Sequence, residues 1–290
     1  MEFDYAEMTT RNIGFVSEEE QARLRGATVF VCGTGGMGGA CILALARIGV
    51  GHLIIADLDD FEVSNLNRQV FCFSDTIGRH KAEATAEVCA RINPEMEVTV
   101  LHGDWADGVE DWVTRADVVV NGTDDLGASL LLYRTARRLG KSVIDAYASP
   151  LPSVYVTAPD DPAHEDRMGY PTVGTDWDKL SEDQRATAFL REAEWVVIHS
   201  SSRRYIDMAM VGDVVAGRRS RMSFAPMVIT TGQLMVYEVV NAVLGRPRGA
   251  DNRGWFFNPY RARVERPRPA IIAAMLRPLV RRFLNGLTAE

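Results

Sequence analysis

The chain has 290 residues, of which 47% are hydrophobic and 24% charged, and its formal net charge at pH 7 is −7. This composition is ordinary for a globular protein, and the length allows a large α/β domain with its own core. The negative net charge makes nucleic acid an unlikely partner. The start, MEFDYAEMTT, lacks the layout of a signal peptide, and no apolar run approaches the roughly 20 residues that span a bilayer. We therefore expect a cytoplasmic protein without membrane contact.

Strands and helices alternate through the first 150 residues. The segment ATVFVCGTGGMGGACILALARIGV predicts a strand over 28–32, a glycine turn over 33–39 and a helix that ends at Gly49. Further strands are predicted in HLIIAD, VTVLHGD, ADVVVNGTDD and KSVIDAYA, with helices over 76–92 and in LLLYRTARRLG. This alternation predicts an α/β protein with a Rossmann-like, doubly wound, largely parallel sheet. We expect the sheet to continue into a mixed or antiparallel C-terminal half.

The glycine turn has the sequence of a phosphate-binding loop. Residues 33–38, GTGGMG, match Gly-x-Gly-x-x-Gly between a strand and a helix, where backbone N–H groups and the helix N-terminus can hold a phosphate. The glycines can alternatively serve only to pack the helix closely on the strand. Asp57 ends the second strand and is placed to accept hydrogen bonds from ribose hydroxyls. These features predict a bound nucleotide, and NAD and ATP share them. The glycines expected around it are Gly33, Gly35, Gly36 and Gly38.

The stretch after the second strand, DDFEVSNLNRQVF, contains polar and basic residues that a dinucleotide-binding site does not require. Arg68 can reach the pyrophosphate that leaves when the α-phosphate of ATP is attacked, and cations must stabilise that negative charge. Asn65 and Gln69 would orient the phosphates or the arginine through amide hydrogen bonds. Lys81 lies early in a helix, where a cation gains nothing unless an anion is present. Arg68 and Lys81 can each instead be a solvated surface residue.

Two carboxylates follow the strand ADVVVNGTDD at the edge of the sheet where ligands bind. Either Asp124 or Asp125 can coordinate Mg²⁺ that bridges phosphate oxygens. Either can instead cap the next helix. The sequence leaves this choice open.

These motifs, GTGGMGG, DLDDFEVSNLNRQ, IGRHK and NGTDD, resemble in order and spacing the ThiF/MoeB/HesA superfamily, adenylate-forming enzymes similar to ubiquitin-activating enzyme. The resemblance covers residues 9–155, and APMVITTGQLMVYEVVNAVLGRP resembles the late helix of the family. It implies that Arg11 is supplied to the active site of the other subunit of a homodimer. It further implies these roles: Gly35 and Gly38 around the nucleotide, Asp57 on the ribose with Asp59 beside it, Asn65, Arg68 and Gln69 at the phosphates, Lys81 at the phosphate chain, and Asp124 on Mg²⁺.

The cysteines depart from the family pattern. Cys32, Cys41, Cys72 and Cys89 all lie in the first third of the sequence, and no two are separated by only two residues, so a Cys-x-x-Cys zinc knuckle cannot form. The apolar surroundings of each predict a buried packing residue. Members of the family that form thioesters carry a later cysteine, which this sequence lacks. We therefore expect no transfer through such a cysteine.

The resemblance implies adenylyl transfer. A carboxylate on a peptide or a small molecule would attack the α-phosphorus of MgATP, and a nucleophile would capture the acyl-adenylate directly. Two other functions remain open: an NAD(P)-dependent oxidoreductase that uses the same glycine-rich loop, and a non-catalytic nucleotide-binding scaffold.

The pattern of the chain changes after residue 159. Residues 160–222 are polar and too long for a plain loop, so we predict an inserted lid or substrate-recognition segment. Its arginines form either a solvated face or a site for an acidic ligand; they are Arg203, Arg204, Arg218, Arg219 and Arg221. A last helix, AIIAAMLRPLVRRFL, is expected to break or kink at Pro278 and to serve as a dimer arm. The predicted organisation is an N-terminal arm at 1–26, a nucleotide-binding adenylation core at 27–159, the insertion at 160–222, a return to the core at 223–260, and a C-terminal helical tail at 261–290.

Overall fold

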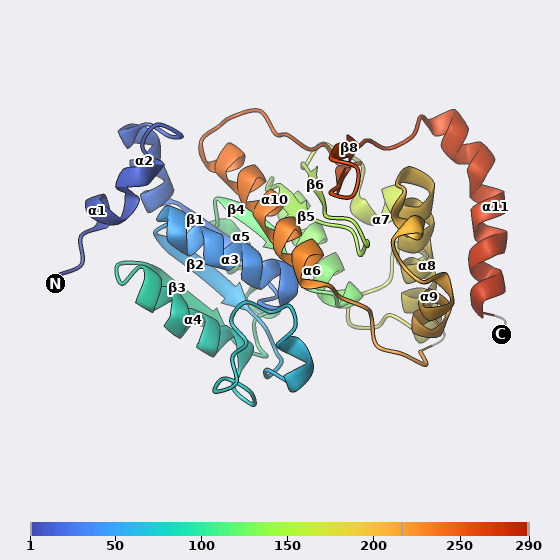
Figure 1. The fold of residues 1–290 in the computed structure, drawn as a ribbon, viewed down its shortest axis with the longest axis horizontal. Coiled ribbons are helices and arrows are strands. Elements are labelled where there is room, and N and C mark those ends of the chain that lie inside the picture. Colours follow the sequence, from blue (N-terminus) through green and yellow to red (C-terminus); the bar gives the residue numbers. More distant parts are fainter. Residues whose placement is uncertain (1, 216, 289–290) are drawn as a thin grey trace.

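A single mixed sheet organises the protein in the computed structural model, which describes residues 2–215 and 217–288 (Figure 1). The strand order is β3-β2-β1-β4-β5-β6-β7-β8. The strands are β1 (Thr28–Cys32), β2 (His52–Ala56), β3 (Glu97–Leu101), β4 (Val118–Asn121), β5 (Val143–Asp145), β6 (Ser153–Thr157), β7 (Trp255–Asn258) and β8 (Arg263–Glu265). Strands β1 to β5 pair in parallel, and β6, β7 and β8 continue the sheet in antiparallel pairings. The predicted fold class is confirmed.

Helices cover both faces of the sheet. They are α1 (Tyr5–Thr9), α2 (Glu18–Gly26), α3 (Gly36–Ile48), α4 (Lys81–Ile92), α5 (Val109–Arg115), α6 (Leu126–Arg138), α7 (His164–Met168), α8 (Glu182–His199), α9 (Met208–Val215), α10 (Ala225–Val243) and α11 (Ala270–Thr288), with 3-10 turns η1 (Thr10–Asn12), η2 (Val63–Asn65) and η3 (Ser202–Arg204). Helices α3, α4 and α10 pack on one face, and α5, α6, α7 and α8 on the other. No helix in the described part of the chain is long and apolar enough to cross a membrane.

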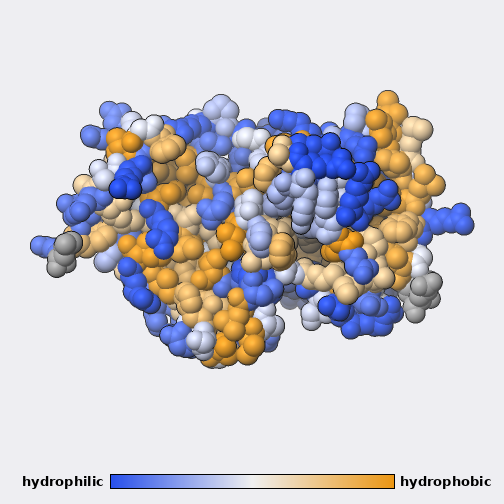
Figure 2. Space-filling model, in the orientation of Figure 1, coloured by the Kyte–Doolittle hydropathy of each residue, from blue (hydrophilic) through white to orange (hydrophobic). Residues whose placement is uncertain are grey.

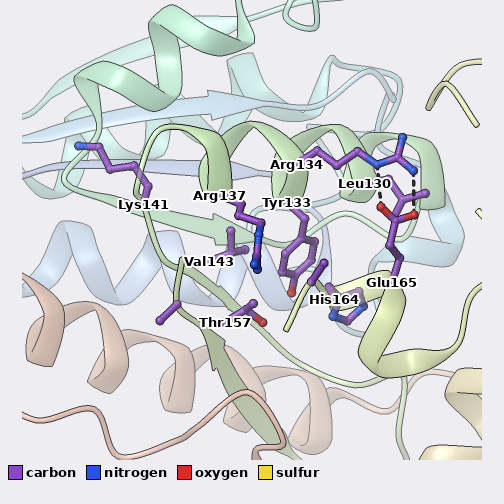
Figure 3. A pocket seen from close by; sticks show the side chains of 11 residues that line it. Leu130, Tyr133, Arg134, Arg137, Lys141, Val143, Thr157, His164 and Glu165 are labelled. Carbon is purple, nitrogen blue, oxygen red and sulfur yellow. Dashed lines mark hydrogen bonds and ion pairs between the residues drawn. The ribbon is translucent and has the colours of Figure 1, made fainter. Parts of the chain in front are cut away.

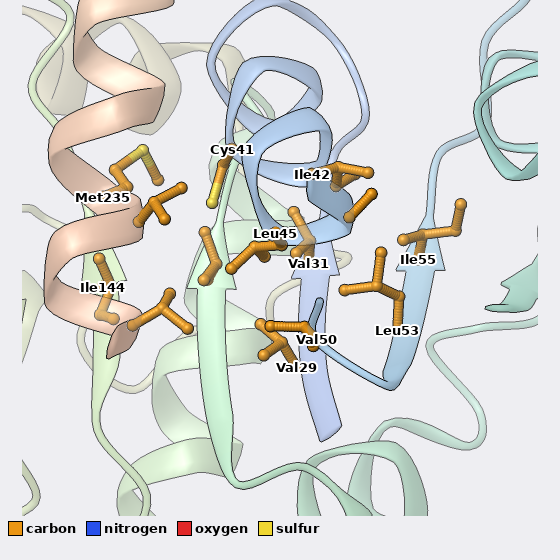
Figure 4. Close-up of a cluster of buried hydrophobic side chains, with 14 of the residues drawn as sticks. Val29, Val31, Cys41, Ile42, Leu45, Val50, Leu53, Ile55, Ile144 and Met235 are labelled. Carbon is orange, nitrogen blue, oxygen red and sulfur yellow. The ribbon is translucent and has the colours of Figure 1, made fainter. Parts of the chain in front are cut away.

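The strand sequences are apolar throughout because each strand is covered on two sides. In β1, Val29 and Val31 face the layer of α3 and α10, whereas Phe30 and Cys32 face the layer of α5 and α6. Figure 4 shows the first of these layers, where Leu45 and Met235 lie over the strands. This packing fixes the direction of the parallel strands, so their carboxyl ends open at one common edge.

Three local predictions need correction. The helix predicted over 76–92 begins only at Lys81, because the side chain of Thr76 accepts a hydrogen bond from Phe73 N at 2.7 Å and so stabilises a turn. Gly78, with φ of 79°, continues the irregular backbone. The tail at 261–290 is not wholly helical, since β8 lies within it and pairs with β7. Helix α11 continues past Pro278, so the break expected there is wrong, and the kink stays a prediction.

The predicted insertion at 160–222 contains helices rather than an extended loop. Ser181 caps α8 through a capping box with Gln184. At the other end of α8, Glu194 pairs with Arg277 at 3.0 Å and with Arg281 at 2.6 Å, which attaches α11. Helices α8, α9 and α11 lie together at the right-hand end of Figure 1. The division of the chain into functional segments remains a prediction.

Candidate functional site

The glycine loop joins the end of β1 to the start of α3 and is shaped by close backbone contacts. Gly33 has φ of 93°, and a Cβ atom there would lie 2.5 Å from the carbonyl carbon of Gly122. A Cβ atom at Gly38 would lie 1.9 Å from the carbonyl oxygen of Gly33. Only glycine therefore permits this contact between the loop, α3 and the exit of β4. The first turn of α3 begins in this glycine cradle, as phosphate binding requires.

Asp57 lies at the tip of β2 and is held against the glycine loop. Its Oδ2 accepts hydrogen bonds from the backbone N of Thr34 at 2.7 Å and from Thr34 Oγ1 at 3.1 Å. Its Oδ1 accepts a bond from Asp59 N at 3.1 Å. The carboxylate is half-buried and its position fits the predicted contact with ribose. Sequence reasoning missed Thr34, whose only signal was a hydroxyl at a variable position of the glycine motif.

Arg68 lies beside the start of α3. Its Cγ would be 3.8 Å from a Cβ atom placed at Gly36. Its Nη1 donates to the carbonyl oxygen of Ser64 at 2.9 Å and to Asn67 Oδ1 at 2.9 Å. These two bonds orient the guanidinium group at the surface of the loop, and its role at the phosphates remains a prediction.

Gln69 and Asn65 are both buried in the same loop. The Nε2 of Gln69 would lie 3.6 Å from a Cβ atom at Gly35, and its Oε1 has no hydrogen-bond partner among the described residues. The N–H groups of this amide already lie toward the glycine cradle, where they can donate to a phosphate-bearing ligand. Asn65 Oδ1 instead accepts from Glu62 N at 3.0 Å, which shapes η2. A phosphate contact for Asn65 remains a prediction.

Lys81 is the first residue of α4 and forms an ion pair with Asp59. The distance from Nζ to Oδ2 is 2.8 Å, and the side chain of Lys81 is only 9% exposed, against 72% for Asp59. The alternative of a solvated surface lysine is therefore wrong. Asp59 also connects to Asp57 through its backbone N, so the pair lies next to the predicted ribose contact.

The two carboxylates after β4 have different surroundings. Asp125 caps α6 by accepting a hydrogen bond from Ala128 N at 2.7 Å, and it pairs with Arg185 at 2.9 Å. Asp124 is exposed, with Oδ2 3.7 Å from Arg221 Nη1. Asp124 is therefore the carboxylate that is free of the capping role, and its oxygens are ligands of the type that Mg²⁺ prefers.

The end of the insertion reaches this site. Arg221 lies 5.1 Å from the ring centroid of Phe189 while it faces Asp124. The carbonyl oxygen of Ser223 accepts from Asn67 Nδ2 at 3.0 Å. Residues just before α10 thus contact both the tip of β4 and the loop that carries Arg68. The sequence alone gave no reason to single out Arg221 among the five arginines named in the insertion.

Within one chain, Arg11 lies apart from the other predicted site residues. It is exposed on η1, and the adjacent Asn12 donates to the carbonyl oxygen of Ile48 at 3.1 Å. Ile48 ends α3, whereas the glycine cradle lies at the start of that helix. Figure 1 shows α1 and α2 at one end of the molecule, away from the loops that follow β2.

A separate cavity under α6 is too small to be the nucleotide site. It lies between α6, β6 and α7 and has a volume of about 30 Å³ (Figure 3). Arg134 closes one side by donating to both carboxylate oxygens of Glu165, at 2.9 and 2.7 Å. Such a volume holds a water molecule or two, far less than a nucleotide requires.

The four cysteines are free and buried. Burial raises the pKa of the Cys72 thiol, and it raises the pKa of Cys41 and of Cys89 to about 12. Higher pKa values disfavour the thiolate that a nucleophile requires. The prediction that Cys72 is a packing residue agrees with this environment.

The fold and the clustered residues define a Rossmann-like α/β protein whose candidate site lies at the carboxyl ends of its parallel strands. The chain belongs to the ThiF family, whose match spans residues 9–272. The resemblance inferred from the motifs is thereby confirmed.

Individual relatives match mainly the first half of the chain. It is 32% identical over 134 residues to the sulfur carrier protein ThiS adenylyltransferase of Escherichia coli, which covers 46% of this chain and 53% of the relative. It is 40% identical over 116 residues to tRNA threonylcarbamoyladenosine dehydratase of Haemophilus influenzae, covering 39% and 44%. These family relatives are adenylyltransferases and dehydratases, hence enzymes. The matched region spans about half the length of these curated relatives.

Solved structures resemble the fold over most of the chain. E. coli MccB with SeMet MccA matches with a TM-score of 0.62 and 17% identity, covering 93% of this chain and 74% of that one. PaaA matches with a TM-score of 0.60 and 19% identity, covering 93% and 76%. At these identities the similarity concerns the fold alone.

Proposed function

We propose that this protein is an ATP-dependent adenylyltransferase that activates a carboxylate as an acyl-adenylate and releases pyrophosphate. The observation that supports this most is the position of Arg68 and Gln69 beside the first turn of α3, with the Lys81–Asp59 pair close to Asp57. The names of the ThiS adenylyltransferase and of other ThiF-family relatives support the same reaction class.

In this proposal the glycine loop and Asp57 position ATP. The N-terminus of α3 binds phosphate through free backbone N–H groups, and Asp57 accepts bonds from the ribose hydroxyls. The substrate carboxylate is already ionised at neutral pH, so the attack on the α-phosphorus needs no general base. The P–O bond to pyrophosphate breaks as the acyl–phosphate bond forms.

Arg68 and Lys81 act on the leaving group. Arg68 stabilises the negative charge that develops on pyrophosphate, and Lys81 contributes a second cation when it moves from Asp59 to the phosphate chain. Asp124 would hold Mg²⁺, which supplies further positive charge between phosphate oxygens when bound. Asn65 keeps the loop that carries Arg68 in shape.

We further propose that the acyl-adenylate passes directly to a nucleophile, with no cysteine thioester. The sequence contains no cysteine after Cys89, and the burial of Cys72 disfavours its thiolate. The acyl substrate would be a peptide or a small molecule that reaches the site past Arg221, whose guanidinium group attracts carboxylates.

We propose further that the protein acts as a homodimer. Arg11 is exposed and distant from the site of its own chain, as a residue supplied to a partner subunit would be. Phe15, four residues after Arg11, has 88% of its surface exposed, and Figure 2 shows hydrophobic surface over the loop of residues 57–80 at the lower edge. Association of two copies would cover such apolar surface.

The test is ATP–pyrophosphate exchange with a panel of carboxylate-bearing peptides and amino acids. We expect Arg68→Ala to lower the exchange rate by about a hundredfold or more, because removing one such charge typically costs about 3 to 4 kcal/mol of transition-state stabilisation. Arg79→Ala is the matched control, since Arg79 pairs with the exposed Glu87 on the same segment. A near-normal rate in Arg68→Ala would remove this arginine from the mechanism.

A further inference from the structure

Three side chains with metal-binding atoms meet at the start of α4, outside the proposed nucleotide site. They are His80, Glu83 and His102, and one donor atom from each lies within 4.8 Å of the others. His80 immediately precedes α4, Glu83 lies in its first turn, and His102 directly follows β3. The cluster therefore joins two elements that are separate in the sequence.

The spacing of the donors is close to that of a metal site. His102 Nε2 lies 3.9 Å from Glu83 Oε1, and the ring centroids of His80 and His102 are 5.0 Å apart. A tetrahedral zinc ion with bonds of about 2.1 Å holds its donors about 3.4 Å apart. The side chains of Glu83 and His102 are 56% and 54% exposed, so both can rotate by the small amount that closure requires.

An independent observation concerns the hydrogen bonding of His80. Its Nδ1 is buried and has no hydrogen-bond partner among the described residues. A buried polar atom without a partner costs free energy, and such atoms need an explanation. Coordination would give the imidazole of His80 a strong interaction that the described side chains do not provide.

We propose that His80, Glu83 and His102 form a binding site for Zn²⁺, with solvent completing the coordination. Two imidazoles and one carboxylate suit zinc, whereas Mg²⁺ prefers a shell of oxygen atoms. The site is thus chemically distinct from the Mg²⁺ proposed at Asp124. It goes beyond the adenylyltransferase proposal and does not depend on it.

The position of the site gives it a structural consequence. Zinc would tie the first turn of α4 to the end of β3, and Lys81 is the first residue of that turn, directly after His80. Occupancy would therefore restrain the backbone that presents Lys81 to Asp59. We expect zinc to raise the Tm of the full-length protein.

The experiment is calorimetric titration of tag-free, chelator-treated full-length protein with ZnCl₂ in the absence of nucleotide. We expect one Zn²⁺ per chain and binding weakened about tenfold or more in both Glu83→Gln and His102→Ala. His52→Ala is the matched control, because His52 pairs with Glu97 at 3.2 Å but is not part of this three-residue cluster. MgCl₂ should not compete.

Two results would overturn the proposal: zinc that binds no more tightly to the wild type than to His102→Ala, or binding weakened as much by His52→Ala. Glu83 is exposed, so Glu83→Gln is not expected to disturb folding. Circular dichroism tests whether each variant keeps its secondary structure. Binding of MgATP is measured in parallel. Loss of zinc with MgATP binding retained separates this site from the nucleotide site.

Discussion

At the scale of single residues, His199 shows what burial does to a titratable side chain. It ends α8, is 3% exposed, and lies 4.1 Å from the ring centroid of Trp195. Its Nδ1 accepts a hydrogen bond from Arg268 N at 3.0 Å, which requires that nitrogen to be unprotonated. Burial, together with nearby arginines, lowers the pKa of His199 from 6.5 to about 4.

A pH dependence of stability follows. Because the folded pKa lies below the unfolded one, folding favours neutral His199, and its contribution is complete above about pH 6.5 and is lost as pH falls toward 4. The difference corresponds to about 3 kcal/mol at most. We expect His199→Gln to flatten the fall in unfolding free energy between pH 7 and pH 4, measured by urea denaturation. Equal slopes in the wild type and in His199→Gln would refute the assignment.

The sequence predicted most candidate site residues because their signals are local. A glycine that must have positive φ, an acidic residue at a strand end and an arginine in a polar run can all be recognised by spacing. Thr34 and Arg221 could not be found in this way. Thr34 depends on its contact with Asp57, and Arg221 depends on the path of a chain that returns from the insertion to Asp124.

At the scale of elements, the helices and strands with clear apolar patterns in the first 150 residues were predicted, including the short β4 and β5, whereas the β7–β8 hairpin was not. Strand β1 and the end of α3 agree with their predicted positions, since apolar runs and Gly49 mark them. The β7–β8 hairpin was missed, because it lies in an arginine- and proline-rich segment and its strands are defined by their pairing. The start of α4 was predicted too early, because the hydrogen bond from Phe73 N to the side chain of Thr76 stabilises a turn there.

One acidic residue, Glu194, connects α8 to α11 through ion pairs. Glu194 is 5% exposed and accepts interactions from Arg191, Arg277 and Arg281. Glu194→Gln would leave these cations without their counter-charge, at a cost of about 1 to 3 kcal/mol. We expect faster hydrogen exchange across α11, measured by mass spectrometry.

The control for this prediction is Glu110→Gln, which removes an exposed partner of Arg138. Exposed pairs contribute little to stability, so exchange should change only slightly there. Unaltered exchange in α11 of Glu194→Gln would show that apolar packing, including that of the buried Ala273 and Leu284, holds the helix alone.

At the scale of the whole molecule, the proposed homodimer predicts complementation between defective subunits. Arg11→Ala and Arg68→Ala should each be nearly inactive in ATP–pyrophosphate exchange. In a mixed dimer, one site has Arg11 from the Arg68→Ala subunit and Arg68 from its own chain, so it is intact. Mixing equal amounts should restore about a quarter of wild-type activity, since half the dimers are mixed and each has one intact site.

A truncation experiment tests whether α11 contributes to this dimer. Its exposed apolar residues, Ile271, Met275 and Leu279, form a stripe visible at the right of Figure 2. Removal of residues 266–290 followed by measurement of molecular mass tests whether this stripe contributes to the dimer. An unchanged dimer would count against a dimer arm, and absence of complementation would place Arg11 outside the partner's site.

Nucleotide selectivity tests the central claim most directly, through thermal unfolding of the wild type and of Arg68→Ala with MgATP, with NAD⁺ and with NADPH. A ligand at a hundredfold excess over its Kd stabilises by about 2.7 kcal/mol, which raises Tm by a few degrees. We predict a rise with MgATP alone, reduced in Arg68→Ala. A rise with NAD⁺ or NADPH and none with MgATP would contradict the adenylyltransferase proposal and favour an oxidoreductase.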